Sequence, residues 1–596
     1  MKTHLVLALA LVAPAVFAQT VEYVNPPIPF SSSPAFGRDA APVTSGIKKL
    51  PILTWGPDAH ILSANNGFKA NANSKLAKAL GTPVEIVVMD DIETQVRSIL
   101  GGQPFFRGTV GQLALANEGL RAKGVEMVAI YQVSFSTGAD GFVFGAGINS
   151  FADLKGKVVV TQANGPHLDF MFMALADANL SPGDVVLKYV RDITNTERKV
   201  AKATDPANAL RNDKTIAGAA MIGPDIAVIT AGGVGTGQED SVRGARAGIT
   251  TKTAPGIIAD VIAVRRDYLE AHEAEVKAFV RTLLESATHY QKNLENISKK
   301  GAADRAMVTA FRAEMEPWAE TFLGDKTLVN DLILWVGVDA KLAGVSGNAE
   351  FFQQANNPIG YDAINAKIRG IFAQAGYLKS QAVTMAKASW DWTNLGVAAV
   401  TSVKKQTFTS EAATRAAADT KDATEIFKWT FQFPAAESDI NWKNYESVFD
   451  TLHEKVKRYG GAIIQIRGHS DPFLYNFLKM KLNSGATTYS IGGQVKPIPP
   501  LESIEANATQ LSFSRAHSVK TAYLEYLREK LGVNREDVNL SRFDLRGMGF
   551  KQPLFANPSG DKEQLKKQRE SNMRCELVII SAESELPSDF DADDLK

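Results

Sequence analysis

Residues 153–160 read DLKGKVVV, and TQANGPHL follows at 161–168. The first segment has the form of a helix end, a tight turn and a buried strand, and the second is a polar loop that opens a helix. The same alternation recurs from residue 47 to 399. Expected strands lie at 49–53, 84–88, 157–160, 217–222 and 257–264, and expected helices at 63–80, 93–100, 168–178 and 270–292. Strands alternating with helices predict an α/β fold with largely parallel sheets.

The N-terminus reads MKTHLVLALALVAPAVFAQT. A basic start, a short apolar run and an A-x-A-like end are typical of a secretory signal peptide, with cleavage expected between Ala18 and Gln19. A buried N-terminal helix is the alternative. The run is shorter than the roughly 20 residues that span a bilayer, and no later run is longer. We therefore expect an exported chain with no transmembrane helix after cleavage.

Composition excludes several classes of function. Sixty-five basic residues balance sixty-five acidic ones, so no nucleic-acid partner is expected. The single cysteine, Cys575, cannot form an intramolecular disulfide, and we expect it in the core. Eight scattered histidines form no metal-binding motif, and no nucleophile motif is visible. The sequence predicts no metal, no cofactor and no enzymatic activity.

Composition also divides the chain into segments. We expect a signal peptide (1–18), an extended leader (19–46), a large α/β domain (47–399), a linker or solvated helix (400–424), a compact α/β domain (425–582) and a disordered acidic tail (583–596).

Four motifs occur in order near the C-terminus: GHSD at 468–471, LSFSRA at 511–516, GMGFKQP at 547–553 and NMRCE at 572–576. Over residues 429–581 the chain resembles the OmpA-like peptidoglycan-binding domain. The resemblance implies that the partner is a peptidoglycan stem peptide carrying diaminopimelate. Asp471 would bind the ammonium of diaminopimelate and Arg515 its carboxylate, with further contacts from Asn507 and Arg574.

A carboxylate beside a guanidinium suits that zwitterion, because Arg holds a carboxylate through two parallel hydrogen bonds. The chain departs from the family pattern in three places. Residues 472–510 separate the first two motifs, Asn507 stands one residue too early, and Met573 replaces an arginine. Taken alone, Asp471 is a turn residue and Arg515 a solvated helix residue, so the interpretation requires both.

A second resemblance covers about 230 residues of the large domain. DLKGKVVV, NLSPGDV at 179–185, MIGPDIA at 221–227 and IIADVIAV at 257–264 are similar to segments of solute-binding proteins of ABC importers, of the nitrate, sulfonate and thiamine-precursor group. The resemblance implies two lobes that close on a small ligand by a hinge movement. The expected fold is thus α/β: a two-lobed periplasmic-binding-protein fold followed by a smaller α/β OmpA-like domain.

Polar loops at strand ends supply the candidate ligand-binding residues. Helix N-termini there favour anions. Trp55 would pack on a planar part of the ligand, Arg107 would pair an anion, and Asp58 and Asp225 instead suggest a cationic group or helix caps. The full set of candidates is Trp55, Asp58, Arg107, Thr109, Gln162, Asn164, His167 and Asp225. For each of them a turn or cap role is the alternative.

Together these features predict a non-catalytic solute-binding protein of the periplasm, tethered to the cell wall and associated with the outer membrane. An ABC importer is a further candidate partner. The rival hypothesis is an envelope scaffold whose binding-protein domain docks a protein partner.

Overall fold

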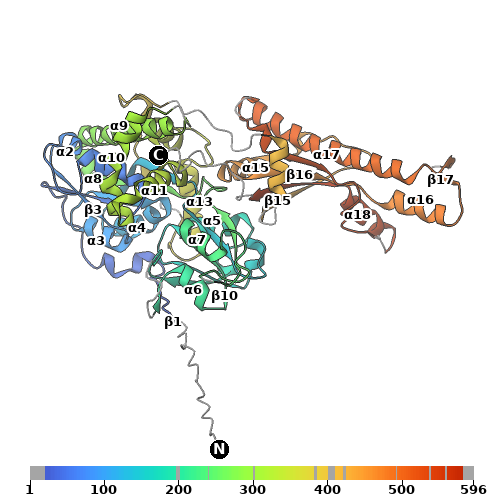
Figure 1. Cartoon of the computed structure of the whole chain (residues 1–596), viewed down its shortest axis with the longest axis horizontal. Coiled ribbons are helices and arrows are strands. Elements are labelled where there is room, and N and C mark those ends of the chain that lie inside the picture. The colour runs from blue at the N-terminus through green and yellow to red at the C-terminus, as the bar shows by residue number, and fades with distance from the viewer. Residues whose placement is uncertain are drawn as a thin grey trace, which may run out of the picture.

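The computed structural model describes residues 20–195, 202–238, 240–299, 303–381, 385–400, 410–419, 424–491, 493–535, 538–556 and 560–581. The expected signal peptide, the acidic tail and much of the expected linker lie outside these residues. A two-lobed α/β body carries an elongated C-terminal part on one side (Figure 1). Within the described residues, no helix is both long and apolar enough to cross a membrane.

The expected leader packs against the body. Strand β1 (Thr20–Val21) pairs with β9 (Lys202–Ala203). Two short 3-10 helices, η1 (Phe30–Ser32) and η2 (Pro34–Phe36), bury Phe30 and Phe36 edge to face. A Cβ on Gly119 would lie 2.3 Å from the Phe36 ring, so this glycine lets the leader approach helix α4 closely. Apolar side chains in an otherwise polar stretch explain the attachment.

The first lobe is built on a sheet of order β13-β5-β12-β4, with β14 on the free edge of β5 and the parallel pair β2–β3 alongside. The strands are β2 (Lys48–Ile52), β3 (Val84–Val88), β4 (Phe105–Thr109), β5 (Met127–Ser136), β12 (Ala259–Arg265), β13 (Ala340–Leu342) and β14 (Ala386–Lys387). The helices are α1 (Ala59–Asn65), α2 (Lys75–Leu80), α3 (Ile92–Leu100), α4 (Val110–Ala122), α8 (Arg266–Ala271), α9 (Glu273–Ile297), α10 (Arg305–Leu323), α11 (Val329–Leu334), α12 (Gly344–Phe352) and α13 (Tyr361–Gln374).

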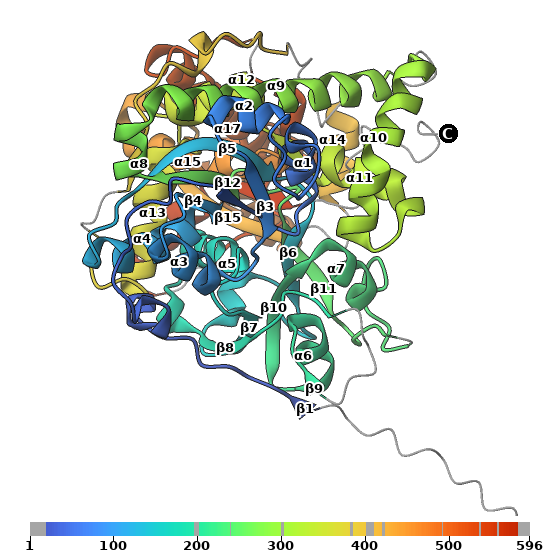
Figure 2. The same ribbon diagram turned by 90° about the vertical axis from the view of Figure 1, so that its left-hand side faces the viewer.

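The second lobe lies below the first in Figure 2 and has its own sheet, of order β11-β6-β10-β7-β8. Its strands are β6 (Asp140–Phe144), β7 (Val158–Gln162), β8 (Val186–Val190), β10 (Ile216–Ile222) and β11 (Arg246–Thr250). Its helices are α5 (His167–Asp177), α6 (Pro206–Asn212) and α7 (Gly223–Thr230). Val159 and Val160 enter different hydrophobic cores, because neighbouring strand residues face opposite sides of the sheet.

Both sheets mix parallel and antiparallel pairs. The expectation of largely parallel sheets was therefore wrong: β12 runs antiparallel to both β4 and β5, and β6 runs antiparallel to β10 and β11. The reason in the first lobe is that β12, on which the chain returns from the second lobe, inserts between β4 and β5 and runs opposite to both. The chain passes between the lobes twice, from β5 to β6 and from β11 to β12. Where these connections meet, the Ser136 hydroxyl donates to Asp140 Oδ2 over 2.6 Å and lies 2.8 Å from the Thr251 hydroxyl.

The C-terminal part has a separate four-stranded sheet of order β15-β20-β16-β19, in which only β16 and β19 run parallel. Its strands are β15 (Thr424–Gln432), β16 (Ile463–Gly468), β19 (Phe543–Gly547) and β20 (Arg574–Ser581). Its helices are α14 (Glu411–Ala418), α15 (Glu446–Arg458), α17 (Leu501–Glu529) and α18 (Lys562–Asn572). Helix α14, in the expected linker, buries Thr414 and Ala417.

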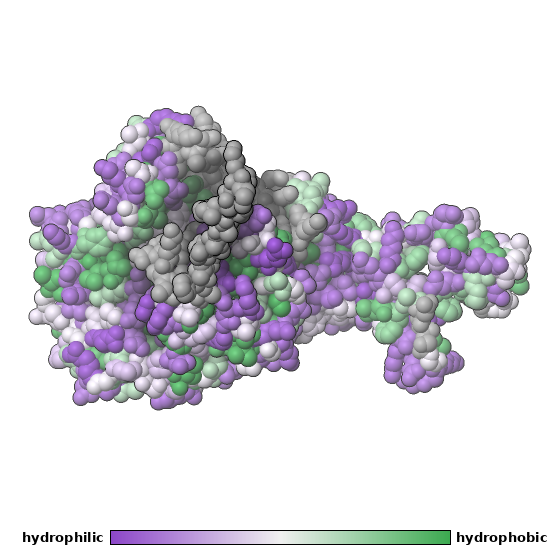
Figure 3. Space-filling model, turned by 60° about the horizontal axis from the view of Figure 1, so that its bottom comes forward, coloured by the Kyte–Doolittle hydropathy of each residue, from purple (hydrophilic) through white to green (hydrophobic). Residues whose placement is uncertain are grey.

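Residues 473–510, between the first two C-terminal motifs, form a projecting arm (Figure 1). The arm comprises α16 (Phe473–Asn483), the hairpin β17 (Thr488–Ile491) and β18 (Gln494–Pro497), and the first turns of α17. Hydrophobic side chains are visible along this extension (Figure 3). The exposed ones include Phe473, Leu474, Met480, Leu482 and Val495.

The C-terminal part docks on the two-lobed body through the end of α15. Asp177, at the end of α5, is buried and ion-paired with Arg458 and Lys367, and the Tyr459 hydroxyl donates to it over 3.0 Å. The loop after α15 also bonds the β11–β12 connection, with Gly461 N–H donating to the Thr253 carbonyl over 3.2 Å. A Cβ on Gly461 would lie 2.1 Å from the Lys252 carbonyl oxygen, so only glycine permits this contact.

Candidate functional site

The N-terminus of α4 in the first lobe meets the N-terminus of α5 in the second. Gly111 N–H donates to Asp169 Oδ2 over 3.0 Å, and Gln112 Nε2 donates to the Asn164 carbonyl over 3.2 Å. The predicted ligand-binding residues lie on the strands and loops around this contact. The interface between the lobes is therefore the candidate ligand site.

Arg107 is fully buried and already ion-paired twice. Its Nη2 lies 2.9 Å from Asp58 Oδ1, and its Nη1 lies 2.9 Å from Asp260 Oδ1. Burial raises the pKa of Asp58 to about 6, against the opposing effect of the Arg107 charge. Asp58 also accepts from the Leu53 N–H and does not cap its helix. The sequence predicted that Arg107 pairs with an anionic ligand group. In the structure its guanidinium is paired with the carboxylates of Asp58 and Asp260.

Trp55 and Thr109 lie on the first-lobe side of the interface. Trp55 Nε1 donates to Ser134 Oγ over 2.9 Å, and its ring stands edge-on to Trp335 at 5.6 Å. Thr109 is the N-cap of α4 and forms a capping box with Gln112. The cap role, given above as the alternative for this residue, is the one observed.

The second lobe contributes the loop between β7 and α5. His167 is fully buried and its Nε2 lies 2.8 Å from Asp140 Oδ1. Asn164 adopts a left-handed conformation with φ 55°, and Gln162 Nε2 donates to the Arg191 carbonyl over 3.3 Å. Asp225 lies in the first turn of α7, where burial raises its pKa and a side-chain hydrogen bond with Thr194 opposes the rise.

The sequence analysis missed Asp169, which lies at the centre of this site. It is 2% exposed, and burial raises its pKa to about 7. A Cβ on Gly111 would lie 1.9 Å from Asp169 Oδ1, so glycine is required for this carboxylate to reach the N-terminus of α4. An acidic residue in the first turn of a helix is usually explained by the dipole of its own helix. For this reason the sequence did not indicate that Asp169 accepts a hydrogen bond from a second helix, α4.

Several buried side-chain atoms around the interface have no hydrogen-bond partner among the described residues: Thr161 Oγ1, Asn164 Oδ1, His167 Nδ1, Asp169 Oδ1 and Asp225 Oδ2. Leaving a buried polar atom unpaired costs about 1–3 kcal/mol, so such atoms indicate an absent partner. The Asn164 amide oxygen can only accept, and the Asp169 and Asp225 oxygens accept when these carboxyl groups are ionised. The arrangement is suited to a bound molecule that carries N–H or O–H donors.

In the C-terminal part, Asp471 follows β16 and is held by two side chains. Its Oδ2 accepts from Arg569 Nε over 2.8 Å, and its Oδ1 accepts from Asn572 Nδ2 over 3.0 Å. The Arg569 guanidinium lies over the Phe473 ring at 3.8 Å. A protein cation thus lies where the sequence placed a ligand ammonium.

Arg515 is 1% exposed and donates to three backbone carbonyls, those of Glu437 (2.9 Å), His469 (2.7 Å) and Pro434 (3.1 Å). Burial lowers its pKa. Because His469 is two residues from Asp471, the fold brings the two predicted wall-binding residues to the same end of β16.

The other two predicted wall-binding residues differ in their surroundings. Asn507 is exposed on α17. Arg574 is buried in β20, where its Nε donates to Glu576 over 2.8 Å and its Nη1 has no partner. Cys575 is buried, as expected. Among the residues that the structure describes, no group of three potential ligands could hold a metal ion.

Comparison with known proteins gives structural likenesses alone, since no family model and no curated protein match the chain. The alkanesulfonate-binding protein SsuA from Xanthomonas axonopodis pv. citri, bound to MOPS, is 14% identical, with a TM-score of 0.37 over 57% of this chain and 96% of that one. The aliphatic sulphonate binding protein SsuA from Escherichia coli is 12% identical, with a TM-score of 0.37 over 57% and 90%. The nitrate-binding protein NrtA from Synechocystis PCC 6803 is 17% identical, with a TM-score of 0.28 over 43% and 65%. At these values the likenesses carry no conclusion about ligands.

Proposed function

We propose that the two-lobed domain captures a small molecule that donates hydrogen bonds and carries positive charge. The unpartnered acceptors at the lobe interface are the observation that supports this proposal. The interface holds four carboxyl groups whose pKa burial raises, Asp58, Asp169, Asp225 and Asp260. Arg107 pairs with Asp58 and Asp260, and no ion pair joins Asp169 or Asp225 to another described residue. A cationic ligand would supply the missing charge and the missing donors.

Titration calorimetry on the chain without residues 1–18 tests the ligand class. We expect binding of a diamine such as putrescine and no binding of ethanesulfonate or nitrate. Asp225→Asn should weaken diamine binding about tenfold or more, because a charge-assisted hydrogen bond is lost. The control is Asp39→Asn, since the Asp39 side chain is fully exposed. Binding of ethanesulfonate in place of the diamine would overturn the charge assignment.

For the C-terminal domain we propose attachment to peptidoglycan through Asp471 and Arg515, in line with its OmpA-like motifs. Their placement at one end of β16 supports this proposal. Arg569 occupies the Asp471 carboxylate, so a stem-peptide ammonium must displace it. The chain would then be a periplasmic, non-catalytic binding protein held at the cell wall near the outer membrane, serving ABC import or sensing.

Sedimentation with purified sacculi tests wall attachment. Asp471→Ala should remove co-sedimentation, and Arg569→Ala should strengthen it by removing the competing cation. The control is Asp439→Ala, an exposed residue of the same domain. Equal sedimentation of all the variants would exclude this site. Arg515→Ala is less informative, because its three carbonyl contacts also stabilise the fold.

A scaffold that docks a protein partner is the second candidate. The direct contact between the lobes through Gly111 and Asp169 favours it, since the protein itself places a carboxylate at the N-terminus of α4. Absence of binding across diamines, amino acids, pyrimidines and sulfonates would support this role over ligand capture.

A further inference from the structure

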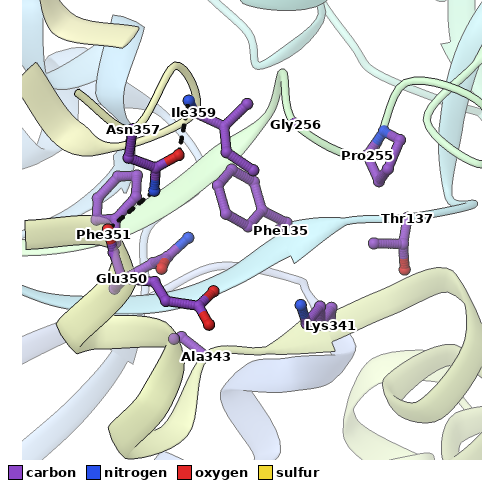
Figure 4. A pocket seen from close by; sticks show the side chains of 12 residues that line it. Phe135, Thr137, Pro255, Gly256, Lys341, Ala343, Glu350, Phe351, Asn357 and Ile359 are labelled. Atoms are coloured by element: carbon purple, nitrogen blue, oxygen red, sulfur yellow. Dashed lines mark hydrogen bonds between the residues drawn. The ribbon is translucent and has the colours of Figure 1, made fainter. Parts of the chain in front are cut away.

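A pocket lies where the two connections between the lobes pass side by side (Figure 4). The end of β5 contributes Phe135 and Thr137, and the β11–β12 connection contributes Pro255 and Gly256. Helix α12 and the loop after it, with Phe351 and Ile359 among their residues, form the remaining wall. None of the unpartnered acceptors of the lobe interface lines this hinge pocket.

The pocket exists because the edge of β5 is interrupted. β13 pairs with β5 at Ser134–Ser136, and β14 pairs with it at Val128–Ala129. Between them the backbone of Gln132 is bonded by a side chain, Asn348 of α12, which accepts from its N–H over 2.7 Å and donates to its carbonyl over 3.0 Å. A helix replaces a strand at this point, and its side chains leave a space beside the sheet.

The interior is mainly apolar and contains one unused donor. Phe135 and Phe351 meet edge to face at 5.8 Å, and Ile359 closes the wall against Gly256, where a Cβ would lie 2.6 Å from its Cγ2. Gln132 is 1% exposed, and its Nε2 has no hydrogen-bond partner. The cavity measures about 140 Å³, close to the size of a cavity that holds benzene.

Polar side chains stand at the mouth of the pocket. Figure 4 shows Glu350 and Lys341 on the α12 side of the opening, and both residues are exposed. The Asn357 amide donates to the Glu350 carbonyl over 2.9 Å, which fixes the loop that leads to Ile359. A ligand therefore meets an apolar interior beneath a polar rim, the usual composition of a small-molecule site.

We propose that the hinge pocket is a second small-molecule site, which takes a compact aromatic or branched aliphatic molecule with a carbonyl acceptor. The acceptor pairs with Gln132 Nε2, and the apolar body packs between Phe135 and Phe351. Because residues of both connections line the pocket, its occupant contacts the two segments about which the lobes turn. This site is independent of the ligand proposed for the lobe interface.

Benzamide matches the size of the pocket and the required acceptor, and it serves as the probe. Calorimetry on the chain without residues 1–18 should show binding that Gln132→Met weakens about tenfold, through loss of one hydrogen bond to a buried donor. Gln510→Met, at an exposed position of α17, should bind benzamide as the unchanged chain does. Equal affinity in Gln132→Met, or no benzamide binding at millimolar concentration, would overturn the proposal.

A crystal soaked with 4-bromobenzamide locates the site directly and does not depend on the folding of a variant. The anomalous signal of bromine should lie in the pocket of Phe135 and Phe351. A bromine peak at the lobe interface or on the surface alone would also overturn the proposal.

Discussion

Asp169 and Gly111 decide how closely the two lobes approach each other. The carboxylate of one lobe accepts a hydrogen bond from the first turn of a helix in the other, and the missing Cβ of Gly111 makes room for it. The partial positive charge of the helix N-terminus and the Gly111 N–H favour the ionised form of Asp169, but burial opposes ionisation more strongly and raises its pKa to about 7. This pair of residues therefore joins the two lobes directly.

Gly111→Ala should separate the lobes, because the added Cβ would lie 1.9 Å from Asp169 Oδ1. We expect a larger radius of gyration by small-angle X-ray scattering and a melting temperature several degrees lower. Gly46→Ala, where an added Cβ meets nothing within 4 Å, is the matched control. An unchanged radius and melting temperature would show that Asp169 does not hold the lobes together.

Asp169→Asn should change the pH dependence of stability. The folded-state pKa of Asp169, about 7, exceeds its ordinary value of about 3.9. Its contribution to stability is therefore fully present below about pH 4 and is lost as the pH rises to 7. The variant should melt at a higher temperature than the unchanged chain at pH 8 and at a similar temperature at pH 4, as calorimetry would measure. A difference that is the same at both pH values would contradict this titration.

Among the elements, those with regular apolar patterns were predicted best. The strand expected at 84–88 is β3, and the helix expected at 93–100 is α3 with one more residue at its start. The helix expected at 63–80 is two helices, α1 and α2, because Asn66 and Gly67 adopt positive φ. Helix α17, which carries the LSFSRA motif, begins ahead of that motif, at Leu501.

The candidate sites were predicted less completely, because partners distant in the sequence decide which charges are free. The sequence locates Arg107 and Asp58 at strand ends but does not show that they pair with each other and with Asp260. It likewise does not show that Arg569, in the last turn of α18, reaches Asp471. Residue type and local position indicated where the candidate sites lie. Only the tertiary contacts show which charged side chains are already paired within the protein, and therefore which charge a ligand would need.

The contact between α5 and α15 depends on one buried carboxylate. Asp177 ends α5, where the helix dipole disfavours negative charge, and the charges of Arg458, Lys367 and Lys455 hold its pKa well below the usual range. Asp177→Asn should destabilise this contact by about 2–3 kcal/mol, because Arg458 loses its buried partner and keeps only Glu454, which is partly exposed. Limited proteolysis should then release the C-terminal part sooner than in Asp39→Asn, and equal cleavage rates would exclude this role.

At the scale of the whole molecule, the C-terminal part contacts the two-lobed body beside the connections between the lobes. The loop after α15 bonds the β11–β12 connection, and the projecting arm extends from the far side of the same domain. Gly256, which lines the hinge pocket, donates its N–H to the Arg458 carbonyl over 3.2 Å. The hinge, the pocket beside it and the C-terminal domain are therefore in direct contact.

This contact has a mechanical consequence. If the lobes turn about the two connections between them, the C-terminal domain bonded to one of these connections turns with them. If the C-terminal domain is held at a fixed surface, a force between that surface and the protein acts on the connections between the lobes. Such a force would favour either opening or closing of the lobes. Tension then shifts the equilibrium between open and closed forms, and binding at the lobe interface in turn changes the force that the attachment bears.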